Sequence, residues 1–191
     1  MRPQSTQYGL PLILEDLSGQ VNKPTAYTDL YDRLRVTCTP SSSSKDLLQL
    51  AFKLGSNGRP GADAVIDIPL KKFDGATISY AGGAVPIPVD AYLRKVKGLS
   101  SRSPCRRFTA SDSHSYTWSL VQSNPKDKST LAWTCTQSDS AAVVAEYTVN
   151  DSNVTGSTSA AVLTVEEHCS GIVLELLTTL TLVRHIAANK L

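Results

Sequence analysis

The chain has 191 residues, of which 41% are hydrophobic and 19% are charged. This composition is typical of a globular domain and excludes a disordered chain. Nineteen basic and seventeen acidic residues leave a formal charge of +2, too small an excess to indicate a nucleic-acid-binding protein. We therefore expect a single domain over residues 1–191, with residues 1–10 as a flexible N-terminal segment and no nucleic-acid partner.

Cysteine spacing and the N-terminus bear on the compartment. The cysteines are far apart, with no CxxC or CxH spacing: Cys38, Cys105, Cys135 and Cys169. Such cysteines are typical of small buried hydrophobes, so we expect neither disulfides nor a metal or other cofactor. The first residues lack the apolar core and cleavage site of a signal peptide, which makes the sequons at Asn150 and Asn153 chance matches in a Ser/Thr-rich loop. The sequence predicts an intracellular, cytoplasmic protein.

Short segments with alternating apolar residues follow one another through most of the chain, separated by turns rich in Gly, Pro, Asn, Asp and Ser. In 33–39, for example, Leu34, Val36 and Cys38 share one face. Pro86 and Pro88 make one segment an edge or bulged strand. The pattern predicts about twelve strands, near 11–16, 25–29, 33–39, 47–54, 64–70, 76–80, 84–89, 106–110, 115–121, 130–135, 142–149 and 160–166.

The period changes after residue 166. From Ser170 to Ala187 the spacing predicts one helix that is apolar around most of its circumference. Such a helix is buried in protein, inserted in a membrane, or covered by a partner. The apolar run Ile172–Val183 contains Glu175 and is shorter than the roughly 20 residues that span a bilayer. We therefore expect no transmembrane span but a core helix, enclosed by an antiparallel β-barrel of about twelve strands.

Several segments together resemble a known family. "ATISYAGGAVPIPVDAYLRKV", "RRFTASDSHSYTWSL", "AVVAEYTV" and the closing "VEEHCSGIVLELLTTLTLV" resemble, in that order, a family from mushroom-forming basidiomycetes catalogued as a domain of unknown function. "LILEDLSG" and "TAYTDLYDRLRVTC" are similar to its first strands. The family is similar to the tubby C-terminal, LURP-one and phospholipid-scramblase group. This resemblance implies a twelve-stranded barrel around a central C-terminal helix, and it brings no catalytic residues.

The strongest candidate site is a group of basic residues in "YLRKVKGLSSRSPCRRF", where no acidic residue occurs between Asp90 and Asp112. We predict that these cations bind anionic lipid head groups or phosphate. The alternative is a solvated loop whose charges prevent aggregation at a sheet edge. The candidate residues are Arg94, Lys95, Lys97, Arg102, Arg106 and Arg107, together with Lys71 and Lys72.

Catalytic candidates are weaker. His114 lies near Asp112, and Cys169 follows His168, but no nucleophile elbow, metal-ligand spacing or phosphate-binding loop frames them. The aromatic residues at alternating positions predict core packing, with an aromatic ligand pocket as the alternative: Tyr116, Trp118, Trp133 and Tyr147.

From these patterns we expect a non-enzymatic binding or scaffold module that binds peripherally to anionic membrane surfaces and to protein partners that the sequence does not identify. The alternative function is an enzyme or small-molecule carrier with a pocket at the mouth of the barrel.

Overall fold

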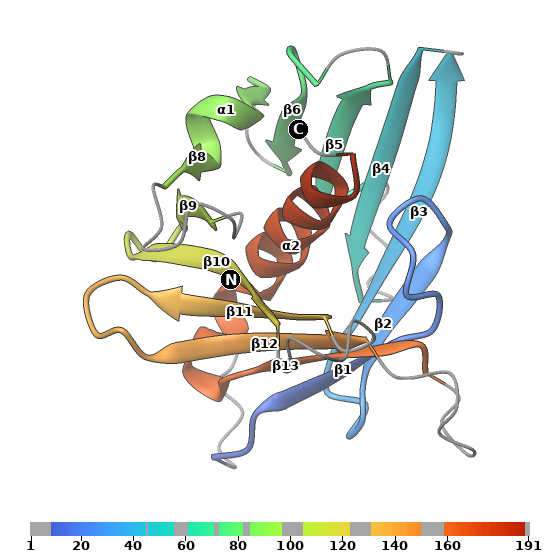
Figure 1. Cartoon of the computed structure of the whole chain (residues 1–191). Helices are drawn as coiled ribbons and strands as arrows, with labels where there is room; N and C mark the ends of the chain where they lie inside the picture. Colours follow the sequence, from blue (N-terminus) through green and yellow to red (C-terminus); the bar gives the residue numbers. More distant parts are fainter. Residues whose placement is uncertain are drawn as a thin grey trace.

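The computed structural model describes residues 9–44, 46–55, 61–70, 73–81, 85–96, 105–122, 131–149 and 159–189. In these residues one antiparallel sheet of thirteen strands surrounds a long C-terminal helix (Figure 1). The strands are β1 (Leu12–Asp16), β2 (Thr25–Asp29), β3 (Arg35–Ser44), β4 (Leu47–Leu54), β5 (Ala64–Pro69), β6 (Thr77–Tyr80), β7 (Ile87–Pro88), β8 (Arg94–Lys95), β9 (Cys105–Thr109), β10 (Ser115–Gln122), β11 (Leu131–Gln137), β12 (Val143–Val149) and β13 (Ala161–Val165). The helices are the short α1 (Val89–Tyr92) and α2 (Val173–Ala188), and the 3₁₀-helix η1 (Glu167–Ile172) leads into α2.

The strand and helix predictions agree closely with this structure. The mainly β architecture and the C-terminal helix are confirmed, and each of the twelve expected strands corresponds to an observed one. The additional strand, β8, has only two residues, both exposed and charged, so it has no apolar alternation from which to predict it.

The sheet consists of two meanders that meet in the middle. Its strand order is β7-β6-β5-β4-β3-β2-β1-β13-β12-β11-β10-β9-β8, so each half runs through neighbouring strands in chain order. The two halves are joined where β1 pairs with β13, from Leu12 opposite Val165 to Asp16 opposite Ala161. This joint brings the first and last described strands together directly before the helix.

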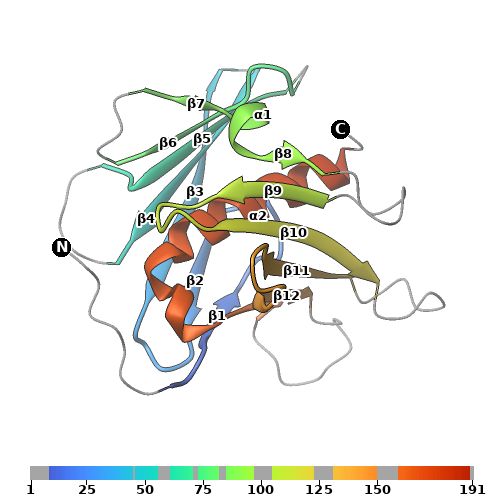
Figure 2. The same cartoon turned by 90° about the vertical axis from the view of Figure 1, so that its left-hand side faces the viewer.

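The described sheet does not close into the barrel that we expected. Its two edges are β7 and β8, and these strands do not pair with each other. The sheet instead curls around α2, and α1 connects its edges (Figure 2). Pro88 lacks the backbone N–H that a ladder requires, and both edge strands are only two residues long. The two edge strands therefore offer few backbone groups for hydrogen bonds that would close the sheet into a barrel.

Helix α2 is the centre of the core. Among its buried residues are Leu176, Leu177, Leu180, Leu182 and Val183, all at most 1% exposed. Together with η1 it forms a 22-residue segment of mean hydropathy 1.5, and in length and composition this segment qualifies as a candidate membrane span. In the folded chain, however, 61% of the qualifying window is buried within the protein, so no transmembrane span is clearly indicated.

Three buried threonines give this apolar helix polar contacts with the sheet. Their hydroxyls also bond to helix carbonyls, as Thr181 Oγ1 does to Leu177 O at 2.8 Å, which satisfies them without water. Tyr80 Oη lies 2.9 Å from Thr178 Oγ1, and Trp118 Nε1 donates to Thr179 Oγ1 at 2.9 Å. A third contact joins Thr181 to Tyr27, so the three threonines contact three different strands: Thr178 contacts Tyr80 of β6, Thr179 contacts Trp118 of β10 and Thr181 contacts Tyr27 of β2.

Candidate functional site: a cavity at one end of the sheet

The N-terminal end of α2 is tied to the surrounding sheet by Glu175. Its carboxylate accepts hydrogen bonds from the Ser111 backbone N–H, at 3.0 Å to Oε2, and from the Ser111 hydroxyl. Tyr92 of α1 donates to Glu175 Oε2 at 3.2 Å. This carboxylate therefore fixes the β9–β10 turn and α1 to the helix, which explains an acidic residue in the apolar segment.

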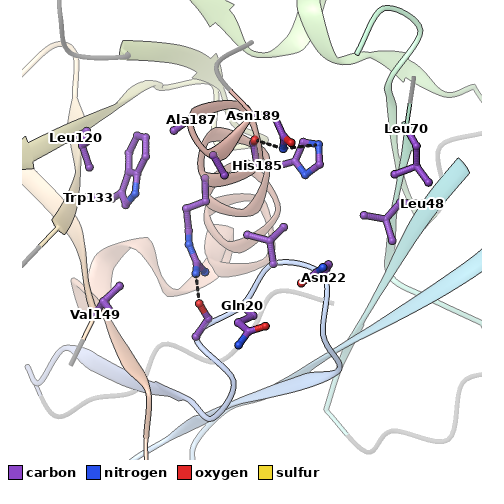
Figure 3. A pocket seen from close by; sticks show the side chains of 14 residues that line it. Gln20, Asn22, Leu48, Leu70, Leu120, Trp133, Val149, His185, Ala187 and Asn189 are labelled. Carbon is purple, nitrogen blue, oxygen red and sulfur yellow. Dashed lines mark hydrogen bonds between the residues drawn. The ribbon is translucent and has the colours of Figure 1, made fainter. Parts of the chain in front are cut away.

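A cavity of about 720 Å³ surrounds the C-terminal end of α2. It is bounded by β10 to β12 on one side and by β4 and the end of β5 on the other (Figure 3). We call this space the mouth cavity. Most of its side chains are apolar, and its lining comprises Gly19, Gln20, Val21, Asn22, Leu48, Leu70, Leu120, Trp133, Val149, Arg184, His185, Ala187, Ala188 and Asn189. Its size and lining are those of a small-molecule site.

Trp133 contributes the largest aromatic surface to this lining. The predicted core packing of the four aromatic residues is confirmed, since Tyr116, Trp118, Trp133 and Tyr147 are at most 5% exposed. Trp133 nevertheless also borders the mouth cavity. Trp133 is therefore both a core residue and a residue of the pocket lining.

Two polar side chains of the mouth cavity lie on the last turn of α2. Asn189 Nδ2 donates to the His185 carbonyl oxygen at 2.8 Å and lies 3.4 Å from His185 Nε2. Phe73 stacks on the His185 ring, with centroids 6.1 Å apart. Burial lowers the pKa of His185 below its ordinary 6.5, because the charged imidazolium loses hydration. At neutral pH this ring is therefore an uncharged hydrogen-bonding group.

Arg184 is the cation of the cavity wall, and its charge is already compensated. Its Nη1 lies 3.7 Å from Asp16 Oδ2, and its Nη2 donates to Gly19 O at 2.6 Å. The guanidinium also lies over the Tyr147 ring, 4.4 Å from the centroid. Asp16 is completely buried, and it further accepts hydrogen bonds from Tyr147 Oη at 2.9 Å and Thr25 Oγ1 at 2.8 Å.

Gly19 is required by this arrangement. Its φ is +60°, a conformation that L side chains rarely adopt. A Cβ there would lie 2.9 Å from the Ala160 Cβ, and the Gly19 N–H donates to Asp16 Oδ1 at 3.1 Å. The β1–β2 turn thus holds the buried carboxylate and the arginine together at the cavity.

The predicted basic residues are only partly within the described chain. Lys71, Lys72, Lys97 and Arg102 lie outside the described residues. The remaining four come together at the β8 edge, where Arg94 is opposite Arg107 and Lys95 is opposite Arg106. We call Arg94, Lys95, Arg106 and Arg107 the basic cluster.

The pairing register divides the basic cluster between the two faces of the sheet. Phe108 is buried on the inner face of β9. Because side chains alternate along a strand, Arg106 lies on the same face and Arg107 lies on the outer face. Arg107 Nε donates to Thr117 Oγ1 at 3.3 Å and Arg94 Nε to Ala91 O at 3.2 Å, both on the exposed side. None of the four has an ion-pair partner within the described part of the chain.

The catalytic candidates from the sequence do not form a site. His114 is exposed, and its Nδ1 lies 3.5 Å from Asp139 Oδ2. Burial raises the pKa of the Cys169 thiol, and its hydrogen bond to Tyr116 lowers it less, so the reactive thiolate is disfavoured. All four cysteines are free; Cys38, Cys135 and Cys169 are buried, as predicted, whereas Cys105 is only partly buried. The residues in described positions contain no group of three or more potential metal ligands.

The sequence carries a signal for some residues in and beside the mouth cavity. Asp16 follows Leu12 and Leu14 in strict alternation, which places a carboxylate on the buried face of β1. Arg184 lies four residues after Leu180, which places it on the same face of the helix as a core leucine. Leu48, Leu70 and Val149 have no distinguishing signal, because they are ordinary strand residues until the sheet curls.

These features define a class of mainly β protein: an antiparallel sheet curled around a buried C-terminal helix, with an apolar cavity at one end. The sequence pattern of a family of unknown function, DUF6593, matches residues 34–187, and the chain belongs to that family. Comparison with curated proteins and with solved structures finds no match.

Proposed function

We propose that the protein is a binding module that takes up a small, largely apolar molecule in the mouth cavity. The observation that carries this proposal is the 720 Å³ space lined mainly by apolar side chains and bordered by Trp133 and His185. Binding of an apolar molecule against these side chains would remove apolar surface from water, which is favourable. This is the carrier function that the sequence left as its alternative.

A cavity-filling substitution tests the proposal. Ala187→Phe places a ring in the cavity, whereas Ala91→Phe places the same ring at an exposed position on α1. We expect the parent chain and Ala91→Phe to bind the neutral dye Nile red in titrations followed by dye fluorescence, and Ala187→Phe to lose about tenfold or more in affinity. Equal binding by both variants would remove the cavity from the function.

A second function, peripheral binding to anionic membranes, is favoured by the basic cluster. Its members form two like-charge pairs across β8 and β9, an arrangement that is destabilising unless an anion neutralises it. Arg94 and Arg107, on the outer face, are the members placed to meet a flat surface. Lys71, Lys72, Lys97 and Arg102 stay predicted contributors to the same surface.

Vesicle sedimentation tests this second function. Arg94→Glu with Arg107→Glu is compared with the matched charge change Lys23→Glu with Lys53→Glu, which lies on other elements. We expect the parent chain to sediment with phosphatidylserine vesicles at low salt, and the first double variant alone to lose binding, with each cation contributing about 1 kcal/mol. Absence of sedimentation of the parent chain would exclude it.

Two further proposals concern origin and compartment. A relationship to the tubby C-terminal, LURP-one and phospholipid-scramblase group is supported by the antiparallel sheet that curls around a C-terminal helix, and we propose it together with the fungal origin of the family. We also propose a cytoplasmic location, because free thiols are typical of reducing compartments.

A further inference from the structure

We infer that the molecule bound in the mouth cavity is a single-chain anionic amphiphile, such as a fatty acid anion, with its chain in the cavity and its acidic head on Lys95 and Arg106. This inference rests on the proposed function, because it names the ligand class of the same cavity.

The strand register places these two cations on the inner face of the sheet. Lys95 is opposite Arg106, and Arg106 is in turn opposite Trp118. Trp118 is fully buried against α2, and paired residues of neighbouring strands lie on the same face. The three positions therefore form one row on the inner face across β8, β9 and β10, from the exposed Lys95 at the sheet edge to the buried Trp118.

This row lies beside the mouth cavity. Leu120 is the next inward-facing residue after Trp118 on β10, and it lines the cavity. Arg106 is thus one inward position from the lining, a separation that a long arginine side chain can bridge. The end of β8, the start of β9 and the C-terminal end of α2 are all on the same side of the molecule in Figure 2.

The charges favour an anion at this point. Arg184 is compensated by Asp16 and Gly19, and burial keeps His185 uncharged at neutral pH. Within the described chain, Lys95 and Arg106 have no ion-pair partner, although they face each other across the ladder. A carboxylate between them would relieve the repulsion and form charge-assisted hydrogen bonds.

The shape favours a flexible chain. The lining residues lie on both sides of the helix end, with Leu120 and Trp133 on one side and Leu48 and Leu70 on the other (Figure 3). An alkyl chain can bend around the helix end to contact both sides, which a flat rigid ring system cannot do. An apolar lining with cations at its border matches an amphiphile with one acidic end.

Isothermal titration of the full chain with two probes of equal chain length, dodecanoate and dodecanol, tests the inference. Both are used below their aggregation concentrations. We expect dodecanoate to bind about tenfold more tightly than dodecanol. Lys95→Gln with Arg106→Gln should remove this preference by weakening dodecanoate binding. The matched control, Arg94→Gln with Arg107→Gln, changes the same two strands and the same net charge on the outer face, and should keep the preference.

The outcomes separate the inference from the proposed function. If both probes bind the parent chain equally, or if the control removes the preference as fully as the inner-face variant does, the inference is overturned while cavity binding stands. If neither probe binds the parent chain, both fail. Circular dichroism melting curves confirm that each variant is folded, and tryptophan emission, to which the cavity residue Trp133 contributes, reports occupancy independently.

Discussion

Asp16 is a carboxylate with no exposed surface on the inner face of an apolar sheet. Its negative charge is accommodated by Arg184, by the hydroxyls of Tyr147 and Thr25, and by the N–H of Gly19. Of these residues, Arg184 and Gly19 also line the mouth cavity. A buried ion pair of this kind favours the observed position of α2 against β1, because a shift of the helix would separate two groups that burial has removed from water.

Removal of one partner should therefore cost far more than removal of both. We expect Asp16→Ala to reduce the free energy of unfolding by about 3–5 kcal/mol, because it leaves the Arg184 guanidinium buried without its counter-charge. Asp16→Leu combined with Arg184→Met should recover much of that loss. Urea unfolding followed by tryptophan fluorescence measures both. Glu15→Ala, on the opposite face of the same strand, is the control and should change little. A double variant no more stable than Asp16→Ala would contradict this account.

At this scale the sequence predicts a side chain's face but not its partner. The alternation of Leu12, Leu14 and Asp16 indicates the inward orientation of the carboxylate. Its ion pair with Arg184 depends on the curl of the whole sheet, which brings the first strand to the end of the last helix. Likewise, the clustering of Arg94 and Arg107 was evident in the sequence, but their separation from Lys95 and Arg106 follows from the register of β8 with β9.

Among the elements, α2 combines burial on nearly all sides with three threonines that contact the sheet. Each threonine hydroxyl faces an aromatic polar group of a different strand, namely β6, β10 or β2. Apolar packing alone is non-directional and would permit the helix to rotate or slide. The three contacts supply direction, because each aromatic group would lose its partner if the helix turned.

Thr179→Val tests this role of the helix. The substitution keeps the shape of the side chain but removes the hydroxyl that accepts from Trp118 Nε1. Because the Trp118 side chain is fully buried, we expect a loss of about 1–3 kcal/mol in the free energy of unfolding. Thr164→Val on β13, at a partly exposed position facing away from the core, is the matched control. A loss no larger than that of the control would show that the contact contributes nothing to stability.

The elements themselves were the most predictable part of the molecule. Alternating segments such as Ala161–Val165 show the inward and outward positions directly. The failure at β8 has a local cause, since Arg94 and Lys95 are both polar and the strand is paired on one side only. The change of period predicts the helix, but it does not indicate which aromatic groups its threonines contact.

For the molecule as a whole, several tyrosine and cysteine side chains are buried within the curled sheet in their neutral forms. Burial raises the pKa of the Cys38 thiol from 9.0 to about 12, with the Asp16 charge adding to the effect. Burial also raises the pKa of Tyr80 from 10.0 to about 12, against the hydrogen bonds from Thr178 and Tyr92, which lower it. The pKa values of Tyr27, Tyr147 and Cys135 are raised for the same first reason, loss of hydration.

Raised pKa values in the folded state make the protein sensitive to alkali. The unfolded chain releases these protons near pH 9.0 for Cys38 and pH 10.0 for Tyr80, whereas the folded chain holds them to about 12. The stabilisation is complete below the unfolded values and is lost as pH rises through this window. We expect the urea midpoint to fall steadily above about pH 9, and Cys38→Ser to reduce the slope near its onset. A midpoint that stays constant to about pH 11 would contradict the burial of these groups.

Closure of the sheet is the whole-molecule property that the sequence did not predict. Strand number and a buried helix are compatible with a closed barrel, and the family resemblance implied one. The open seam depends instead on two very short strands around α1, and on Pro88 at the edge. The mouth cavity follows from the same global geometry, since it exists only where the curled sheet extends past the packed part of the helix.

The single joint between β1 and β13 has a consequence for the order of events during folding. Every other strand pairing of the described sheet connects neighbours in the chain, so each meander can form from local contacts. Pairing of β1 with β13 closes a loop that contains most of the chain. The chain loses conformational entropy when this loop closes, before the contacts between the two halves stabilise it. We expect the rate-limiting step to be this closure, with α2 packing at the same time, so that the two halves form early and independently and meet only at the end.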